Sequence, residues 1–221
     1  MPVLDNHDSR IRYVELLMQR DDLKDIPAFD LPEGYRFVFY RPGDRDAWIE
    51  IEHSAKELAG YEHGVRTWER FFGHVEHTLH NRMLFIENEK GEKVATATAY
   101  YDEHGDLPAE CGQVHWVAVR RDHQGKGLAK PLIMQVLRVM KERGHERAVL
   151  HTQTTSWVAV RLYLNFGFYP MPENAVRNRD GWRIVKALTD HPALEAFDKA
   201  DWQLILTPEA YAEAAQQENL K

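Results

Sequence analysis

Cysteine is nearly absent from the sequence, in which Cys111 is the only one among 221 residues. A lone cysteine cannot form a disulfide within the chain, and it cannot build a cysteine-based zinc site. Nothing near Cys111 in the sequence would activate its thiol, so we expect a small apolar residue there. His74, His77 and His80 are expected on the solvated face of a helix, and we predict no metal.

Long apolar runs and basic runs are missing as well. The first 20 residues lack the apolar segment of a signal peptide, and no later stretch approaches the ~20 apolar residues of a membrane helix. The formal net charge is −7, with charges of both signs spread along the chain, which disfavours a nucleic-acid-binding face. We therefore expect a cytoplasmic protein with no nucleic-acid and no membrane partner.

Repeats and low-complexity tracts are missing too, while 43% of the residues are hydrophobic. This composition and length suit one globular domain with a substantial core. Turns rich in glycine, proline and charged residues separate the predicted elements. Strands are predicted at 35–40, 83–87, 94–101, 112–119 and 147–153, and helices at 48–58, 68–79, 128–143 and 157–166. This order is α+β (mixed α/β), with three consecutive antiparallel strands, and it is not a repeated βαβ series.

The two ends of the chain lie outside this pattern. Ser9 is placed to cap a first helix, whose apolar face would consist of Ile11, Val14, Leu17 and Met18. A linker is expected at 25–34. Near the other end, a strand is predicted at 202–206, and a last helix follows it with Pro208 at its first position.

The most informative segment is a glycine-rich turn between a predicted strand and a predicted helix. Its sequence from 124 to 129 is Gln-Gly-Lys-Gly-Leu-Ala. The first amides of a helix have no partner within it and carry partial positive charge, so they bind anions. Gly125 and Gly127 let a phosphate approach the backbone closely, and Lys126 adds a full charge. The turn therefore suits a phosphate. A glycine-rich turn that only starts a helix is the alternative, and the local pattern by itself favours that alternative.

Two common phosphate motifs do not fit this turn. A dinucleotide-binding motif would need glycine at position 130, where Lys130 stands, and a P-loop would need Ser or Thr at Gly127. The segment instead resembles the pyrophosphate signature of the GNAT superfamily of N-acetyltransferases, which is Gln or Arg, two residues, Gly, one residue, then Gly or Ala. A second segment, 159–168, resembles the later signature of the same family.

The resemblance covers about residues 35–170 and implies a fold, a cosubstrate and a division of the chain. The implied fold is a GNAT-like twisted, mostly antiparallel sheet flanked by helices, and the implied cosubstrate is acetyl-CoA. We expect a helical extension at 1–34, an acetyl-CoA-binding core at 35–170, and a segment at 171–221 that completes the same domain. Many members have Pro at the position of Arg121 and Asn at the position of Ser156, so the sequence departs from the family there.

The resemblance also assigns residues to the cofactor. Backbone groups of one strand end would bond the pantetheine arm, as an added strand pairs with a sheet edge. Amides of the turn would hold the pyrophosphate, and Ser156 would cap the helix that follows. The residues so assigned are Val117, Ala118, Val119, Gln124, Gly125, Lys126, Gly127, Leu128, Ala129 and Ser156.

Two side chains are candidates for proton transfer. Tyr163 stands where the family usually has its acidic tyrosine, although a helical tyrosine is often a core residue. For the base, strand alternation places Gln113, His115, Val117 and Val119 on one face. Members of the arylalkylamine type have His at the position of His115, and an imidazole titrates near neutral pH, so the resemblance makes His115 the candidate base. A structural histidine and a base that acts through water from elsewhere are the alternatives.

The acceptor would be the primary amine of a small molecule, with a peptide or protein amine as a weaker choice. In the family the acceptor lies near the loop between the first two helices, here 59–64, so Tyr61 and Glu62 are the candidate substrate residues. The end segments would close the acceptor site or form a homodimer interface. A non-catalytic sensor or scaffold that binds acyl-CoA is the alternative function, and the motif does not exclude another acyl donor.

Overall fold

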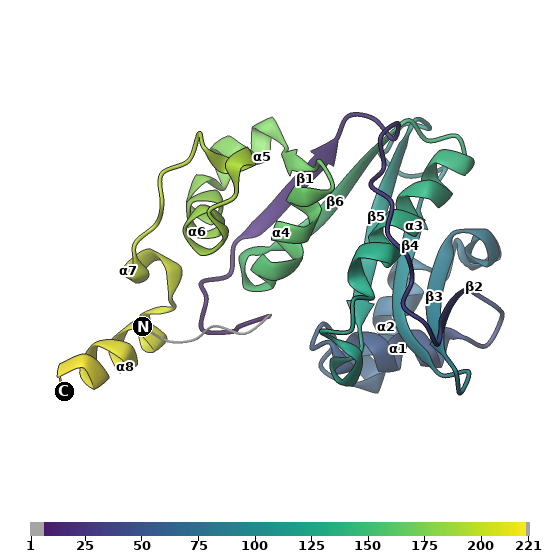
Figure 1. The fold of residues 1–221 in the computed structure, drawn as a ribbon, viewed down its shortest axis with the longest axis horizontal. Helices are drawn as coiled ribbons and strands as arrows, with labels where there is room; N and C mark the ends of the chain where they lie inside the picture. The colour runs from purple at the N-terminus through teal and green to yellow at the C-terminus, as the bar shows by residue number, and fades with distance from the viewer. Residues whose placement is uncertain (1–6, 220–221) are drawn as a thin grey trace. The chain divides into compact units, whose positions relative to one another are not determined.

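The computed structural model describes residues 7–219. The chain forms two compact units, and Figure 1 labels most of their helices and strands. The central unit consists of residues 21–149, and the terminal unit of residues 1–20 with 150–221. Strand β6 (Arg147–Gln153) begins in the central unit and ends in the terminal unit. The domain boundaries predicted at residues 34 and 170 remain predictions.

An antiparallel sheet forms the middle of the central unit. Its strands, in spatial order, are β2 (Tyr35–Phe39), β3 (Met83–Asn88), β4 (Lys93–Tyr100) and β5 (Cys111–Val119). Neighbouring strands of this set are antiparallel. At the start of β6, the amides of Glu146 and Arg147 donate to the carbonyl of Glu110 at 2.8 and 3.0 Å. The predicted mixed α+β fold with a mostly antiparallel sheet is confirmed.

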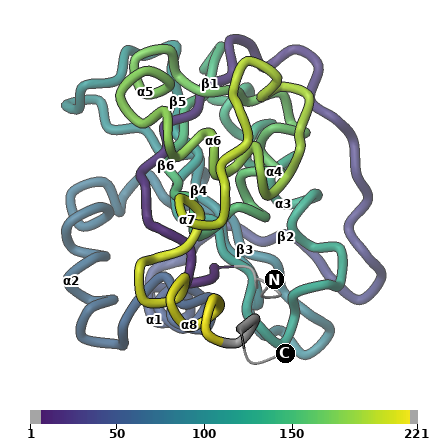
Figure 2. The backbone as a smooth tube through the Cα atoms, turned by 90° about the vertical axis from the view of Figure 1, so that its left-hand side faces the viewer, coloured from purple at the N-terminus to yellow at the C-terminus, as the bar shows by residue number. Residues whose placement is uncertain are grey.

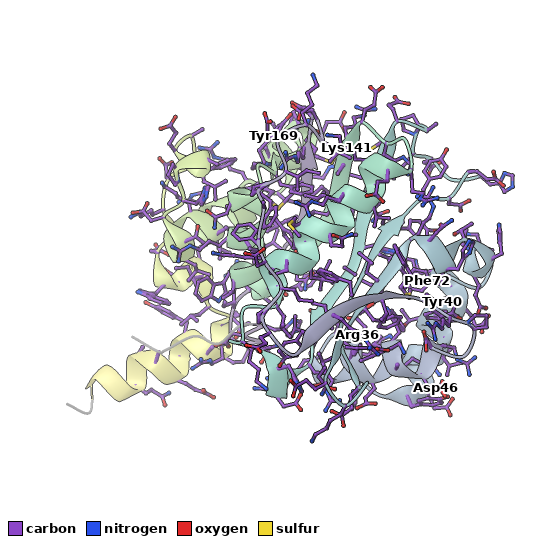
Figure 3. The ribbon with its side chains drawn as sticks, turned by 45° about the vertical axis from the view of Figure 1, so that its right-hand side comes forward. Arg36, Tyr40, Asp46, Phe72, Lys141 and Tyr169 are labelled. Atoms are coloured by element: carbon purple, nitrogen blue, oxygen red, sulfur yellow. The ribbon has the colours of Figure 1, made fainter. Side chains whose placement is uncertain are left out.

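Helices cover both faces of this sheet. On one face, α1 (Arg45–Ser54) and α2 (Tyr61–Phe71) pack over a core that contains Trp48, Trp68 and Phe85. Tyr40 and Phe72 belong to the same core, and Figure 3 shows them close together. The other face carries α3 (Ala129–Glu142), whose Met140 lies against Gly112 of β5.

The second predicted helix has different bounds in the structure. The predicted loop at 60–64 is wrong, because α2 already begins at Tyr61, and the helix predicted to reach residue 79 ends at Phe71. A short 3-10 helix, η1 (Glu76–Asn81), follows. Gly64 is a packing residue rather than a loop residue, since a Cβ there would lie 2.5 Å from Cγ2 of Ile49 in α1.

The predicted linker is confirmed as a segment without regular structure. Residues 21–34 contain bends and one turn but no helix or strand, and Figures 1 and 2 draw them as a plain connecting segment. The amide of Phe29 donates to Sδ of Met134, 3.2 Å away on α3, and Nζ of Lys130 lies 5.3 Å from the centre of the Phe29 ring. The segment therefore runs along α3 and is fixed by contacts close to the glycine turn.

The terminal unit combines short strands with helices. Strand β1 (Glu15–Arg20) pairs antiparallel with β7 (Tyr169–Pro170). The helices are α4 (Trp157–Asn165), α5 (Pro172–Arg177), α6 (Arg179–Thr189), α7 (Trp202–Ile205) and α8 (Pro208–Asn219), with 3-10 turns η3 (Thr154–Ser156) and η4 (Pro192–Leu194). The last predicted helix is confirmed as α8.

Two predictions about the terminal unit are wrong. The predicted first helix is the strand β1, in which Leu16, Met18 and Arg20 are buried while the residues between them are exposed or half-buried. Burial of every second residue is the pattern of a strand, in which successive side chains point to opposite faces of the sheet. The strand predicted at 202–206 is instead the helix α7, because the Asp201 side chain accepts a hydrogen bond from the Leu204 amide and caps it.

Candidate functional site

The glycine turn adopts the backbone that its sequence predicts. A short 3-10 helix, η2 (Arg121–His123), leads into Gly125 and Gly127, whose φ angles are 75° and 81°. Residues with a side chain rarely adopt such angles. Gly127 is also close to the linker, since a Cβ there would lie 3.6 Å from Cγ of Pro32. Both glycines are therefore required by the turn itself.

The amides of this turn are available to a ligand. Helix α3 begins at Ala129 without a side-chain cap, and Pro131 in its first turn has no N–H. Among residues 7–219, no carbonyl accepts a backbone hydrogen bond from residues 125–128, and the amide of Leu132 is the first to bond back, to Leu128 at 3.1 Å. Lys126 is exposed beside them. Unpaired donors of this kind at a helix N-terminus suit an anion.

Two hydrogen bonds fix the turn to its surroundings. Nε2 of Gln124 donates to the carbonyl of Val119 at 3.0 Å, which ties the turn to the end of β5. The amide of Arg121 donates to Oγ of Ser54 at the end of α1, also at 3.0 Å. The amide donors are therefore held in place before any ligand binds, which lowers the entropic cost of binding.

A β-bulge interrupts β5 just before the turn. Thr96 of β4 pairs with Ala118, but Thr98 pairs with His115, so β5 has one more residue than β4 in this interval. Trp116 lies in the bulge with a φ of 48°, which is rare for a bulky residue. Bulges of this kind often lie next to active sites, where they redirect side chains.

The bulge corrects the predicted face of β5. His115 pairs with Thr98, and Ala118 pairs with Thr96 and belongs to the core under α1 and α2, so both lie on that face. Val119 pairs with Ala95 and lies on the opposite face. The prediction that His115 and Val119 share a face is wrong, because the extra residue reverses the alternation after it.

His115 lies in an aromatic enclosure, defined as Phe71, Phe72, Tyr100 and Trp116. The His115 ring is half-buried, and its centre lies 4.8 Å from that of Tyr100 and 5.0 Å from that of Phe71. Phe72 and Trp116 are 5.8 and 5.9 Å away. The histidine is thus held by rings from α2, β4 and β5 and keeps an accessible part.

The structure does not bring Tyr61 and Glu62 to His115. Both are exposed in the first turn of α2, and the Tyr61 hydroxyl donates to the carboxylate of Asp46 at 2.9 Å. His115 contacts Phe71 at the last turn of the same helix. Ten helical residues separate the two ends by about 15 Å, so Tyr61 and Glu62 could contact only a distant part of an acceptor.

Tyr163 and Ser156 belong to the terminal unit. Tyr163 on α4 is 7% exposed, and its ring centre lies 6.1 Å from that of Phe168. Ser156 is the residue before α4, as predicted, but its hydroxyl caps no helix amide. It accepts a hydrogen bond from Gln153 at 2.8 Å and lies 3.2 Å from Nδ1 of His7.

Glu52 on α1 is not among the site residues predicted from the sequence. This carboxyl is fully buried, and neither oxygen has a hydrogen-bond partner among the described residues. Burial raises its pKa well above the usual range, and the negative charge of Glu57 raises it further. A sequence signal exists, because Glu52 shares with Trp48, Ile51 and Ala55 the stripe of α1 that should be apolar.

The described residues contain no group of three or more His, Cys, Asp or Glu side chains that could hold a metal ion. His74 instead pairs with Asp102 at 2.9 Å, and Nδ1 of His80 contacts the carbonyl of His77. Cys111 is buried, and burial raises the pKa of its thiol.

Between residues 7 and 219, no helix is long and apolar enough to cross a bilayer.

Comparisons with known proteins agree on one family. Residues 45–168 match the model of the acetyltransferase (GNAT) family. A mycothiol acetyltransferase of Acidothermus cellulolyticus is 29% identical over 193 residues, which are 77% of this chain and 55% of that protein. N-acetyltransferase 8B of Rattus norvegicus is 41% identical over 56 residues, 25% of each chain.

A solved structure shows the same fold. The GCN5-related N-acetyltransferase of Sphaerobacter thermophilus aligns with a TM-score of 0.57 and 24% identity, over 73% of this chain and 49% of that one. The chain spans about half the length of the mycothiol acetyltransferases it matches, 55% and 50% for two of them.

Proposed function

Because the chain belongs to the GNAT family of acetyltransferases, we propose that it transfers the acetyl group of acetyl-CoA to the primary amine of a small molecule. The observation that carries this proposal is the glycine turn with its unpaired amides at the start of α3. The similarity to mycothiol acetyltransferases, which act on a small molecule, supports the acceptor class.

The turn fits the diphosphate of acetyl-CoA in chemistry. Amides of residues 125–129 would donate to it, while that of Gln124 already donates to the carbonyl of Arg121 at 3.3 Å. Lys126 would add a positive charge. Backbone groups of Val117, Ala118 and Val119 would bond the pantetheine arm, and Ser156 would support the cofactor through the start of α4. Acetyl-CoA supplies a thioester, an activated acyl group whose thiolate is a good leaving group.

His115 is proposed as the base of the reaction. An amine with a pKa of about 10 must lose a proton before it can attack a carbonyl. The amine nitrogen bonds to the acetyl carbon and forms a tetrahedral intermediate, and its proton moves to the imidazole of His115. Gln113, two residues earlier on the same face of β5, cannot accept a proton usefully. The half-buried position of His115 suits contact with an acceptor.

Tyr163 is proposed as the acid. When the intermediate collapses, the bond between carbon and sulfur breaks, and the leaving thiolate takes a proton from the tyrosine hydroxyl. This role rests on the match between residues 159–168 and the family signature. Tyr61 and Glu62 remain proposed contacts of the acceptor, limited to a part remote from the reacting amine.

Coenzyme A binding by two matched glycine variants tests the proposal. Gly125 and Gly91 have φ angles of 75° and 77°, and at both positions an added Cβ would meet open space. Alanine causes similar backbone strain at both sites, but only at Gly125 does the added methyl group meet a bound diphosphate. By calorimetry, Gly125→Ala should weaken the affinity for coenzyme A at least about tenfold, or about 1.4 kcal/mol, while Gly91→Ala should leave it unchanged.

Thiol release from acetyl-CoA across a panel of amines then separates an enzyme from a sensor. Amine-dependent release supports the transferase. Tight binding of acetyl-CoA without release for any amine would favour the alternative, a non-catalytic acyl-CoA sensor or scaffold. An equal affinity for coenzyme A in Gly125→Ala and in the unchanged protein would contradict both functions.

A further inference from the structure

Buried polar atoms without partners gather in one layer between α1 and the sheet. We define the buried polar layer as Glu52, Thr96, Thr98 and the indole nitrogens of Trp48 and Trp116. None of these atoms is exposed, and none has a hydrogen-bond partner among the described residues. Each unpaired polar atom costs about 1–3 kcal/mol in a protein interior. Five such side chains in one layer therefore need an explanation.

The course of α1 over β5 places Glu52 within this layer. The ring of Trp48 lies 5.2 Å from that of Trp116, and Ser54 accepts a hydrogen bond from the amide of Arg121. Helix α1 thus runs in the same direction as β5. Glu52 follows Trp48 by one turn on the same stripe, and its side chain points back toward the helix start. Its carboxyl therefore faces the sheet near Ala118.

The two threonines continue from Glu52 toward His115. Thr96 pairs with Ala118, and Thr98 pairs with His115. Residues two apart on a strand share a face and lie about 6.6 Å apart. The face of β4 and β5 that α1 and α2 cover therefore carries Thr96, Thr98 and His115 in spatial order, and Glu52 of α1 lies over its Thr96 end. The bulge at Trp116 produces this order, because it brings His115 and Ala118 to one face.

The chemistry of the layer suits bound water. A carboxylate accepts hydrogen bonds, an indole N–H donates one, and a hydroxyl does both. A buried water makes about three hydrogen bonds to polar groups of this kind. Simple packing would favour apolar residues at all these positions, because unpaired polar groups destabilise a core. The mixture of donors and acceptors instead suits a hydrogen-bonded chain.

We propose that water bound in the buried polar layer links Glu52 to His115 and that Glu52 takes up the proton released by the acceptor amine. This proposal rests on the proposed function. The amine proton binds one ring nitrogen of His115, and the other ring nitrogen gives up a proton through Thr98 and water. The carboxylate of Glu52 becomes a carboxylic acid and later returns the proton to solvent. Glu52 acts through His115, so it is a positioning residue.

The surroundings of Glu52 make it a stronger base than an ordinary carboxylate. Burial and the charge of Glu57, which follows α1, raise its pKa. The titratable groups on the same face of the sheet are His115 on β5 and Tyr100 on β4, while Glu50 pairs with Arg120 on the outer side of α1. Below its pKa, Glu52 is neutral and cannot take a proton. The rate should therefore rise with pH as Glu52 ionises.

The pH profile of acetyl transfer tests the relay. Glu52→Gln should lower kcat by about 100-fold, a typical contribution of one proton-transfer group, and remove the rising limb at low pH. Thr98→Val should have a similar effect, and Thr98→Ser should restore the profile because it keeps the hydroxyl. Glu50→Gln on the exposed side of α1 and Thr67→Val, a buried threonine on α2, are the controls and should keep the full profile.

Two kinetic outcomes would overturn the proposal. One is a Glu52→Gln enzyme with an unchanged rising limb and kcat within about twofold of the unchanged enzyme. The other is loss of the limb in Glu52→Gln together with a normal profile in Thr98→Val, which would exclude the route through Thr98. Circular dichroism of each variant establishes that it is folded. If Thr98→Val is not folded, Thr98→Ser, which keeps the hydroxyl, remains the test of the route through Thr98.

An infrared readout separates this proposal from the proposed function. The carboxyl band of Glu52, obtained as the difference between the unchanged protein and Glu52→Gln, should titrate with pH and shift in Thr98→Val. A band that is insensitive to Thr98→Val would overturn the relay, whatever the activity. If the band responds but no amine accepts an acetyl group, the layer is confirmed as a hydrogen-bonded chain and the transfer reaction is the part that fails.

Discussion

At the scale of single residues, backbone strain and unpaired polar groups occur at the proposed site. Gly125 and Gly127 have positive φ angles, and the amides of residues 125–128 donate to no carbonyl of the described residues. His115 is held among four aromatic rings, and Glu52 is buried without a partner among the described residues. Each of these features has a cost in stability, through strain or unpaired polar groups. Costs of this kind are typical of residues retained for function.

Glu52 should leave a signature in the stability of the folded protein. Its pKa is raised in the folded state, so the folded state binds its proton more tightly than the unfolded state. Its contribution to stability is then fully present below the unfolded pKa of about 4.3 and is lost as pH rises through the folded pKa. Each tenfold difference in proton affinity corresponds to about 1.4 kcal/mol.

Urea unfolding at a series of pH values measures this contribution. The free energy of unfolding of the unchanged protein should fall with rising pH relative to that of Glu52→Gln, and level off above the folded pKa. Glu50→Gln, with its exposed carboxyl, should show no such difference. Parallel curves for Glu52→Gln and the unchanged protein would show that Glu52 is not buried in solution.

At the scale of elements, the close packing of α1 on α2 depends on Gly64. A Cβ there would lie 2.5 Å from Cγ2 and 2.9 Å from Cγ1 of Ile49. Gly64→Ala should therefore destabilise the protein by about 1–3 kcal/mol, the usual cost of overpacking, although alanine favours a helix. Urea unfolding measures the loss, and Ile49→Val combined with Gly64→Ala should recover part of it. Equal stability of the single variant and the unchanged protein would contradict this contact.

The elements also show which sequence signals are sufficient. Strands β2 to β6 and helices α1, α3 and α4 follow from periodicity and from turn residues, and the structure confirms them. The strand β1 was missed because Ile11, Val14, Leu17 and Met18 happen to have helical spacing, while the burial of Leu16 and Met18 follows the sheet. In such a short segment, pairing with a distant strand outweighs the spacing of the apolar residues in the sequence.

Part of the candidate site was also predictable from the sequence. The glycine turn has a local signal, since its residues need special backbone angles and the helix start supplies donors. The bulge at Trp116 has none, because neither Trp nor its neighbours in β5 favour a positive φ. Glu52 has a sequence signal of its own, because it places a carboxylate on an apolar stripe of α1.

At the scale of the whole molecule, the terminal unit depends on both ends of the chain. Residues 1–20 belong to the same unit as 150–221. Within it, Leu16 and Met18 are fully buried, β1 pairs with β7, and Ile11 bridges to Leu206. The N-terminal segment is therefore a part of the core of this unit, although it lies far from the other residues in sequence.

Removal of residues 1–20 should unfold the terminal unit. The deletion exposes the apolar surface that covered Leu16 and Met18, and the loss of two such buried side chains costs about 4–10 kcal/mol by the usual range, comparable to the stability of a domain. Limited proteolysis should then cleave within 150–221 much faster than in the full chain. A deletion of 1–6 keeps Ile11, Leu16 and Met18 and is the control. Equal protection of 150–221 in both deletions would contradict this dependence.

The bulge at Trp116 gives the two halves of β5 opposite phase. Before the bulge, odd-numbered residues such as His115 lie on the face of the sheet that α1 covers. After the bulge, the even-numbered Ala118 lies on that face. A deletion of this single residue would restore one continuous phase, and every side chain on one half of the strand would exchange its neighbours. The length of β5 is therefore under a stricter constraint than its composition.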